Sequence, residues 1–447
     1  MSNERKTWTS RIGFVLASAG AAVGLGAIWK FPYLAGTNGG SVFLFPYILL
    51  TFTVGLALLI AEIALGRLGR GGIVTTYRRI AGNKLVLIPM GYLGVLTGFL
   101  VLSFYSAIGG WTIAYLFEAI GGEGLIADQS QLGAHFGAFT ADPVLSVGFQ
   151  WLFLLLNGLI VALDITKGIE RLSKVLMPLL FVLMCVVIVR GLMLPGAWGG
   201  VEFLFKFDFE SFTFMGLLQA MGFTFFSLCV GCGCMMTYGS YLDDKSNLLR
   251  SCSWIAFLAV IASLMGGLMV MPPVFAFGLD PTAGPGLTFI TMPAIFAQLP
   301  FGQIFAVIFY ICLLVAAITS SVSMIEILVA YLVDERGMSR PKASVISTIA
   351  LAIVGVLPCL SFGALSDVTF FGGKTFFDIF DFFTSNLALP IGGLLILYLA
   401  GRTCWPEISR NLAGGEPVSE GTLKALRFTT LVLAPILVLA VLISGLV

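Results

Sequence analysis

The sequence has little charge and almost no histidine. Only 11% of its 447 residues are charged, whereas an average soluble domain has about 25%. Cys229, Cys232 and Cys234 lie close together, but a zinc site needs about four nitrogen or sulfur ligands, and the one histidine, His135, is far away in the chain. We therefore interpret the eight cysteines as small buried thiols and expect no metal centre or disulfide framework. The net charge of +1 gives no sign of a nucleic-acid partner.

Long apolar segments are what the sequence has in abundance. Hydrophobic residues make up 58% of it, and the mean hydropathy is +1.03. A helix needs about 20 mostly apolar residues to cross a bilayer, and longer ones tilt or extend beyond it. The sequence therefore predicts an all-α polytopic membrane protein with eleven transmembrane helices, at residues 12–36, 41–68, 86–121, 145–164, 171–194, 211–240, 251–278, 303–334, 340–363, 376–400 and 425–446.

The basic residues are divided unevenly between the two ends of these spans. All but four of the 24 lysines and arginines lie on the side of the N-terminus; the exceptions are Lys30, Arg190, Lys206 and Lys374. Because cytoplasmic loops are enriched in basic residues, this pattern predicts a cytoplasmic N-terminus. An odd number of spans then puts the C-terminus outside. We expect a multi-pass protein of the plasma (cell inner) membrane.

Two of the predicted spans carry glycines in their middle. Gly20, Gly24 and Gly26 interrupt the first span, and Gly231 and Gly233 interrupt the sixth. A glycine costs a helix about 1 kcal/mol relative to alanine. Unwound backbone inside a membrane is tolerated only where protein buries it or where it lines a polar cavity. The alternative is that these glycines serve close helix packing.

Broken helices five spans apart are typical of secondary transporters with two inverted repeats, in which both breaks meet near the middle of the membrane. Unwound carbonyls there can bind a cation, and half-helix N-termini an anion. We therefore predict one transmembrane transporter domain over residues 1–447, with repeat one at 12–194, repeat two at 211–400 and a last span at 425–446.

A series of motifs in fixed order resembles one family, the neurotransmitter:sodium symporters, which have the leucine-transporter fold. The resemblance covers roughly residues 5–402, and eleven spans are found in some bacterial members. The matching residues are Trp8, Arg11, Gly13, AVGLGAIWKFPYLAGTNGGSVFLFPY (22–47), Glu62, Gly66, Arg67, KGIERLSKVLMP (167–178), FFSLCVGCG (225–233), TYGSY (237–241), FITMPAIFAQ (289–298), AAITSSVSMIE (316–326), DFFTSN (381–386) and LPIGG (389–393).

The resemblance implies one sodium site between spans one and eight. Its ligands would be the carbonyl oxygens of Gly20, Val23 and Ala316 and the hydroxyls of Thr319 and Ser320. By themselves, such hydroxyls in a helix more often bond to the carbonyl four residues earlier.

A second sodium site matches only in part. Ala22 and Ser227 align with family ligands, but Ala27 stands where the family has an asparagine. No chloride site is expected, because the family's glutamine and its span-seven serine correspond to Phe223 and Ala262.

The resemblance also implies a site for an amino acid. Gly24 stands where amine-transporting relatives carry a carboxylate, which leaves room for the carboxylate of the substrate. Cys232 and Met324 are unbranched and polarizable, which favours a large hydrophobic or aromatic side chain. For Cys229, simple packing is an equally good interpretation. The implied substrate contacts are Ala22, Gly24, Leu25, Gly26, Val101, Tyr105, Ile108, Phe226, Ser227, Cys229, Cys232, Ser320 and Met324.

Two gates follow from the same resemblance. Their residues are Lys30 with Asp381 on the outer side, and Arg5 with Asp334, supported by Trp8 and Tyr241, on the cytoplasmic side. Two further acids within spans, Glu62 and Glu326, are expected to satisfy nearby backbone groups or, alternatively, to carry protons. Asp164, at the end of a span, is expected to be a helix cap.

The sequence thus predicts a sodium-coupled symporter that imports an L-amino acid by alternating access. No covalent chemistry is expected, so we predict that it is not an enzyme. The alternatives are a proton-coupled amino-acid transporter, with Glu62 or Glu326 as the carrier, and a non-transporting amino-acid sensor. Expected partners are the substrate, Na⁺, the lipid bilayer and, in one alternative, a second copy in a homodimer.

Overall fold

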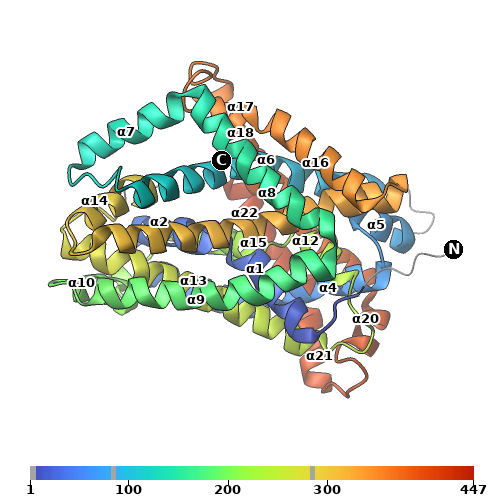
Figure 1. Cartoon of the computed structure of the whole chain (residues 1–447). Helices are drawn as coiled ribbons and strands as arrows, with labels where there is room; N and C mark the ends of the chain where they lie inside the picture. The colour runs from blue at the N-terminus through green and yellow to red at the C-terminus, as the bar shows by residue number, and fades with distance from the viewer. Residues whose placement is uncertain (1–6, 82–86, 282–286, 447) are drawn as a thin grey trace.

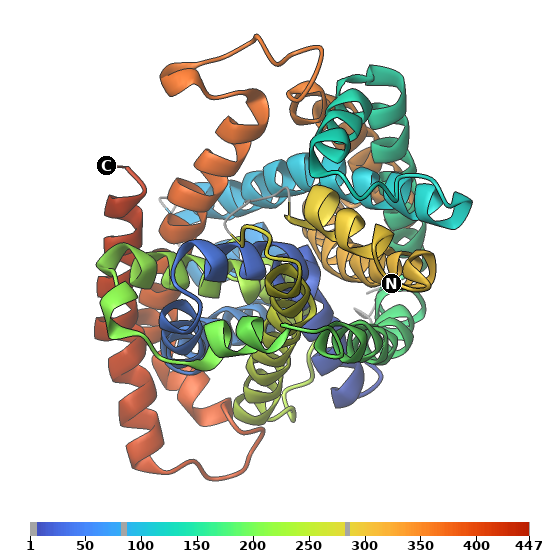
Figure 2. The same ribbon diagram turned by 90° about the vertical axis from the view of Figure 1, so that its left-hand side faces the viewer.

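The computed structural model describes residues 7–81, 87–281 and 287–446, and every regular element in this part is a helix. Most long helices share one general direction, which Figure 1 shows from the side and Figure 2 from one end. Ten helical segments of 21 residues or more are apolar enough to span a membrane, and the sixth predicted span is a shorter, divided one. The predicted all-helical membrane fold is therefore confirmed.

The first four spans begin and end within a few residues of the predicted bounds, and the fifth begins six residues earlier than predicted, at Ile165. Their elements, including short π-helical segments (η), are α1 (Arg11–Leu25), η1 (Gly26–Lys30) and α2 (Phe31–Thr37); α3 (Ser41–Leu50), η2 (Thr51–Gly55) and α4 (Leu56–Gly69); α6 (Ile88–Gly121); α8 (Pro143–Leu163); and η4 (Ile165–Glu170) and α9 (Arg171–Leu192).

The later spans also follow the prediction, although the last begins five residues earlier, in the polar turns of α21. Their elements are α11 (Phe214–Ser227) and α12 (Cys234–Gly239); α13 (Leu248–Ala276); α15 (Gly302–Arg336); α16 (Arg340–Val354) and α17 (Val356–Leu360); α18 (Phe376–Phe382), η8 (Phe383–Ala388), α19 (Leu389–Tyr398) and η9 (Leu399–Thr403); and α21 (Glu420–Phe428), η10 (Thr429–Leu433) and α22 (Ala434–Ser444).

Shorter helices connect the spans. They are α5 (Ile73–Ala81), α7 (Gln129–Ala141), α10 (Trp198–Phe205), η5 (Phe209–Ser211), η6 (Leu287–Thr291), α14 (Met292–Ala297), η7 (Phe371–Gly373) and α20 (Trp405–Asn411). Asp128 caps α7, and hydrogen bonds from the side chain and backbone of Ser130 lower the pKa of its carboxyl group.

Four elements, α1, α6, α11 and α15, form the middle of the bundle. The first span, α1, packs against α15, α13 and α11, and α6 packs against α15 and α8. Close approach is possible where small residues face a neighbour: a Cβ on Gly110 of α6 would lie 2.6 Å from the Gln150 backbone nitrogen of α8. The buried faces of α1, α6, α11 and α15 thereby enclose the centre of the molecule.

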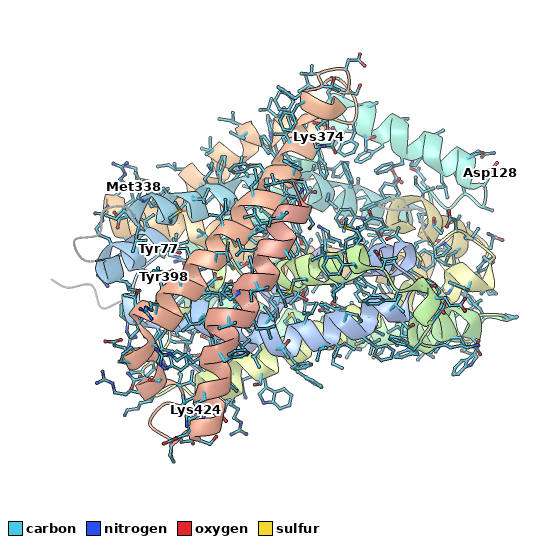
Figure 3. All side chains as sticks on the ribbon, turned by 180° about the vertical axis from the view of Figure 1, so that it is seen from behind. Tyr77, Asp128, Met338, Lys374, Tyr398 and Lys424 are labelled. Atoms are coloured by element: carbon cyan, nitrogen blue, oxygen red, sulfur yellow. The ribbon has the colours of Figure 1, made fainter. Side chains whose placement is uncertain are left out.

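The two ends of the bundle differ in what they carry. Figure 3 shows Tyr77, Met338 and Tyr398 at one end and Asp128 at the other. We call the first end, which also holds Trp8, the N-terminal side. The opposite end, which holds Asp128 and Tyr33, is called the vestibule side.

Candidate functional site

The first break lies in the middle of span one. Gly24 departs from helical geometry, and the π-helical segment η1 follows at once. The Leu25 N–H, which has no helical partner at this point, donates to the hydroxyl oxygen of Tyr105 on α6 at 3.0 Å. A Cβ on Gly24 would lie 2.7 Å from Ser320 Oγ and 3.3 Å from Tyr105 Oη. This position therefore has no room for a side chain.

The second break separates α11 from α12. Three residues between them adopt positive φ: Cys229 (55°), Gly231 (96°) and Gly233 (83°). Glycine adopts this conformation without cost, whereas Cys229 is an unusual residue for it. The predicted interruptions of spans one and six are thus both present.

A buried carboxylate satisfies the backbone of this second break. Glu62 of α4 accepts hydrogen bonds from the N–H groups of Gly231 (2.7 Å), Met235 (3.2 Å) and Met236 (3.4 Å). Its side chain is fully buried. The first of the two roles expected for Glu62, satisfying backbone groups, is the one that these contacts fit.

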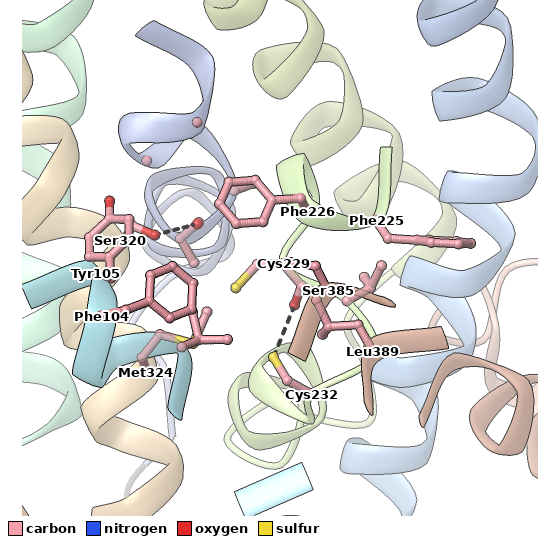
Figure 4. A pocket seen from close by; sticks show the side chains of 16 residues that line it. Phe104, Tyr105, Phe225, Phe226, Cys229, Cys232, Ser320, Met324, Ser385 and Leu389 are labelled. Atoms are coloured by element: carbon pink, nitrogen blue, oxygen red, sulfur yellow. Dashed lines mark hydrogen bonds between the residues drawn. The ribbon is translucent and has the colours of Figure 1, made fainter. Parts of the chain in front are cut away.

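A cavity lies where the two breaks meet. Figure 4 shows Tyr105, Phe104 and Met324 on one wall, Phe225 and Leu389 on the other, and Cys229 between them. Its lining residues are Ala21, Ala22, Gly24, Gly26, Val101, Phe104, Tyr105, Phe225, Phe226, Cys229, Val230, Cys232, Ser320, Met324, Ser385 and Leu389.

Ten of the thirteen substrate contacts expected from the sequence line this cavity; Leu25, Ile108 and Ser227 do not. Ser385 and Leu389, both in span ten, line it without having been expected. They lie in the quoted motifs DFFTSN and LPIGG, so the motifs marked the segment without indicating its place at the pocket.

The five expected sodium ligands belong to α1 and α15, which pack against each other. Thr319 Oγ1 donates to the carbonyl oxygens of Val315 (2.9 Å) and Ala316 (3.1 Å), and Ser320 Oγ donates across to Ala21 (3.1 Å). A Cβ on Gly20 would lie 3.1 Å from Thr319 Cβ, so the two helices touch here. Hydroxyl oxygens that donate their hydrogen keep lone pairs for a cation, and carbonyls and hydroxyls are hard ligands. The donor set therefore fits a sodium ion.

A second group of hydroxyls lies behind the pocket. Tyr47 Oη is 3.3 Å from Ser227 Oγ and 3.1 Å from Ser263 Oγ, so spans two, six and seven meet there. The sequence comparison had aligned Ala262 with this position in span seven. The side chain that reaches Tyr47 belongs instead to the next residue, because a one-residue shift on a helix rotates the face by about 100°.

A wide vestibule opens above the pocket. It shares Phe104, Tyr105, Phe225, Phe226, Ser385 and Leu389 with the pocket. Lys30 and Asp381 both line it. No ion pair joins them in the described part of the chain: Lys30 Nζ lies 4.4 Å from the centre of the Phe226 ring, and Asp381 accepts from Ser385 Oγ at 2.8 Å.

The N-terminal side is closed by tightly bonded side chains. Trp8 donates from Nε1 to the Tyr238 carbonyl (3.0 Å), and its own N–H donates to the Tyr241 carbonyl (3.2 Å). Tyr241 Oη donates to Glu326 at 2.6 Å, and Arg340 forms two hydrogen bonds with the same carboxylate.

The remaining predicted residues are placed as follows. Arg5 lies outside the described residues. Asp334 accepts from the Gly72 N–H at 2.6 Å. Asp164 accepts from the N–H groups of Thr166 and Lys167, as expected for a cap.

A membrane bundle whose first and sixth spans are both interrupted around one enclosed pocket has the architecture of a secondary transporter. The family model described as the sodium:neurotransmitter symporter family matches residues 5–125 and 146–447. The chain belongs to this family, and it is a sodium-dependent transporter of that kind.

Relatives of the chain include bacterial and animal proteins. The uncharacterised sodium-dependent transporter YhdH of Bacillus subtilis is 43% identical over 410 residues, which cover 92% of this chain and 90% of that protein. An uncharacterised sodium-dependent transporter of Haemophilus influenzae is 32% identical over 434 residues, 92% of each chain. The human sodium- and chloride-dependent GABA transporter 2 is 27% identical over 443 residues, 89% of this chain and 71% of that protein.

A solved structure is also similar. The crystal structure of MhsT in complex with L-phenylalanine is 38% identical in sequence, covers 99% of this chain and 100% of that chain, and has a TM-score of 0.91. The leucine-transporter type of fold expected from the sequence is thereby confirmed.

Proposed function

We propose that the protein is a sodium-coupled symporter that imports an L-amino acid with a large hydrophobic or aromatic side chain. The observation that carries this proposal is the cavity bounded by both broken spans. It offers a few polar groups around Tyr105 and mostly apolar walls elsewhere, as expected for a zwitterion with a hydrophobic side chain. MhsT, whose structure is similar, binds L-phenylalanine, which supports the same substrate class here.

The polar groups of the pocket are proposed to hold the backbone of the amino acid. Its carboxylate would lie beside the side-chain-free Gly24 and accept from Tyr105 Oη and the unwound N–H groups near Leu25 and Gly26. Its ammonium group would donate to carbonyls exposed by the two breaks.

The rest of the pocket is proposed to hold the side chain of the substrate. Phe226, Met324 and Cys232 supply aromatic and sulfur surfaces. A thioether beside an aromatic ring contributes about 0.3–1.5 kcal/mol, so these walls favour phenylalanine-like over small aliphatic substrates.

Sodium is proposed to bind to Gly20, Val23, Ala316, Thr319 and Ser320. All five residues lie on the two elements that also border the substrate, because Gly24 of α1 and Ser320 of α15 reach the cavity. An ion that fixes α1 against α15 would therefore strengthen substrate binding, and the substrate would strengthen sodium binding equally.

The coupling ion is proposed to be sodium rather than the proton. Glu62 is occupied by three backbone N–H groups, and Glu326 by Arg340 and Tyr241. Both carboxyl groups are thus fully buried and engaged by protein groups, which supports a structural role for each. Replacing Na⁺ by choline at fixed pH should abolish uptake; unchanged uptake would favour proton coupling.

The basic residues on the N-terminal side support a cytoplasmic location for it, and the vestibule would then face the outside. With the vestibule wide and the N-terminal side closed, the structure corresponds to an outward-facing state of alternating access.

A thermal-shift screen of the twenty amino acids, each with and without sodium, tests the proposal. We expect L-phenylalanine and its large apolar neighbours to raise the melting temperature only when sodium is present. Stabilisation by small polar amino acids alone would refute the substrate class. Counterflow in proteoliposomes then separates transport from sensing, because a sensor binds without exchanging substrate.

A further inference from the structure

Three of the eight cysteines lie in the second break. Cys229, Cys232 and Cys234 fall within one six-residue stretch, and all eight cysteines have free thiols. Within residues 7–81, 87–281 and 287–446, no three His, Cys, Asp or Glu side chains are arranged to hold a metal ion. Thiol–disulfide chemistry, rather than metal binding, is therefore the chemistry that these three cysteines fit.

Two of these thiols border the proposed substrate pocket. Cys229 and Cys232 both line it, and Figure 4 shows their sulfur atoms beside its centre. The neighbours of the Cys229 thiol are the thiols of Cys232 and Cys234, and Cys232 Sγ lies 4.0 Å from the Cys229 carbonyl oxygen. Cys234 is fully buried and does not line the pocket. Cys232 is thus the neighbour that shares the pocket with Cys229.

A path leads from the vestibule to these thiols. The pocket and the vestibule share the wall around Phe226, and the ring of Phe226 separates them. A small uncharged molecule that passes this ring meets Cys229 next. None of the other cysteines lines either space.

The two thiols belong to the interrupted part of span six. Positive φ at Cys229, Gly231 and Gly233 takes this stretch out of the helical hydrogen-bond pattern, and the Gly231 N–H donates to Glu62 instead. Joining Cys229 to Cys232 requires Cα atoms roughly 4.4–6.8 Å apart, which a C-x-x-C segment can reach by local rotation.

We propose that Cys229 is a modification site for small uncharged disulfide or thiosulfonate reagents that enter by the route of the substrate, and that Cys232 resolves the adduct into a Cys229–Cys232 disulfide. This inference uses the proposed function only in naming the substrate that competes with the reagent.

The chemistry balances with the reagent as the oxidant. The Cys229 thiolate attacks a sulfur of the reagent, a mixed disulfide forms, the reagent's leaving group departs, and the thiol proton goes to solvent. The Cys232 thiolate then attacks the Cys229 sulfur, which releases a small thiol and leaves the internal disulfide. Two thiols lose two electrons, and the reagent accepts them.

The test treats the purified full-length protein with methyl methanethiosulfonate. Peptide mass spectrometry should find Cys229 joined to Cys232, and L-phenylalanine binding with sodium should be lost and return after dithiothreitol. Prior occupancy by L-phenylalanine and sodium at 100 times its Kd should slow the modification about 100-fold. Equal modification with and without bound substrate would overturn the route.

Three variants separate the formation of the adduct from its resolution. For each variant, L-phenylalanine binding after treatment is compared with its binding before treatment. Cys232→Ser should stop at a methylthio adduct on Cys229. Cys229→Ser should give no internal disulfide and should keep its binding, whatever its starting value. Cys312→Ser, a buried cysteine away from the pocket, should behave like the wild type.

Two outcomes would contradict the proposal: an unmodified Cys229 in protein that still binds L-phenylalanine, and loss of binding in treated Cys229→Ser equal to that of the wild type. If the untreated protein binds no amino acid, the proposed function fails, while peptide mapping still decides whether Cys229 is modified.

Discussion

On the vestibule side of the pocket, one aromatic ring and one lysine separate the substrate site from open space. Phe226 lies beneath Lys30, and both residues line the vestibule. On the N-terminal side, Trp8 and Tyr241 are hydrogen-bonded to main-chain and side-chain partners, and Arg340 pairs with the fully buried Glu326. The same pocket thus has a lightly held end and a firmly held end.

The two ends of the pocket are held by interactions of different strength. A cation over a ring contributes about 0.5–2 kcal/mol, so a few substrate contacts can move such a gate. Buried charge pairs and caged aromatics are costly to break one partner at a time, so they keep the opposite end closed until the whole set rearranges. Substitutions at the two ends of the pocket, and at the proposed sodium site between them, test this contrast.

Arg340→Met should have the largest effect, because it leaves Glu326 buried without its cationic partner. We expect a loss of about 3–5 kcal/mol and a clearly lower melting temperature. Arg410→Met, at an exposed arginine of α20, is the matched control and should change little. A melting temperature of Arg340→Met equal to the wild type would show that the pair does not hold the N-terminal side.

Trp8→Ala should open the same side through lost packing. Removing this largely buried indole, together with its bond to Tyr238, should cost about 3 kcal/mol and weaken L-phenylalanine binding. Melting curves and equilibrium binding measure the two effects. Trp198→Ala removes an indole that is 67% exposed, and an equal effect there would refute the assignment.

Thr319→Ala acts between the two sides, at the proposed sodium site. Losing one oxygen ligand to a charged ion should cost about 2 kcal/mol, or roughly a thirtyfold higher sodium concentration for half-maximal substrate binding. A sodium titration of L-phenylalanine binding measures it. Thr112→Ala, another buried threonine whose hydroxyl bonds four residues back, is the control. Unchanged sodium dependence in Thr319→Ala would exclude this residue as a ligand.

Lys30→Ala should have the smallest effect, because it removes only the cation over Phe226. We expect about 1 kcal/mol, seen as roughly fivefold faster substrate dissociation with normal expression. Lys374→Ala removes a similar contact, 5.2 Å from the Phe382 ring, that does not cover the pocket. Equal acceleration in both variants would assign the effect to surface charge instead.

Much of the fold could be predicted from the sequence, because crossing a membrane demands long apolar helices and leaves few alternatives. The two breaks were visible for the same reason: Gly24 and Gly231 stand where a lipid-facing helix would not keep glycine. The glycines did not indicate which side chains would satisfy the interrupted backbone. That Glu62 satisfies the second break, and that Tyr105 satisfies the first, depends on packing between spans far apart in the chain.

The site was predicted less completely than the fold. Span ten contributes Ser385 and Leu389 to the pocket; the sequence identifies their motifs but does not show which face of this span meets the pocket. In span seven, Ser263 rather than Ala262 meets Tyr47, because neighbouring positions on a helix face directions about 100° apart.

The most direct test of the account is an experimental structure with saturating sodium and L-phenylalanine. We predict that the amino acid lies between Tyr105 and Phe226, with its carboxylate at the break after Gly24 and an ion held between α1 and α15. Continuous helices through residues 22–26 and 229–233, with the ligand bound elsewhere or not at all, would contradict it.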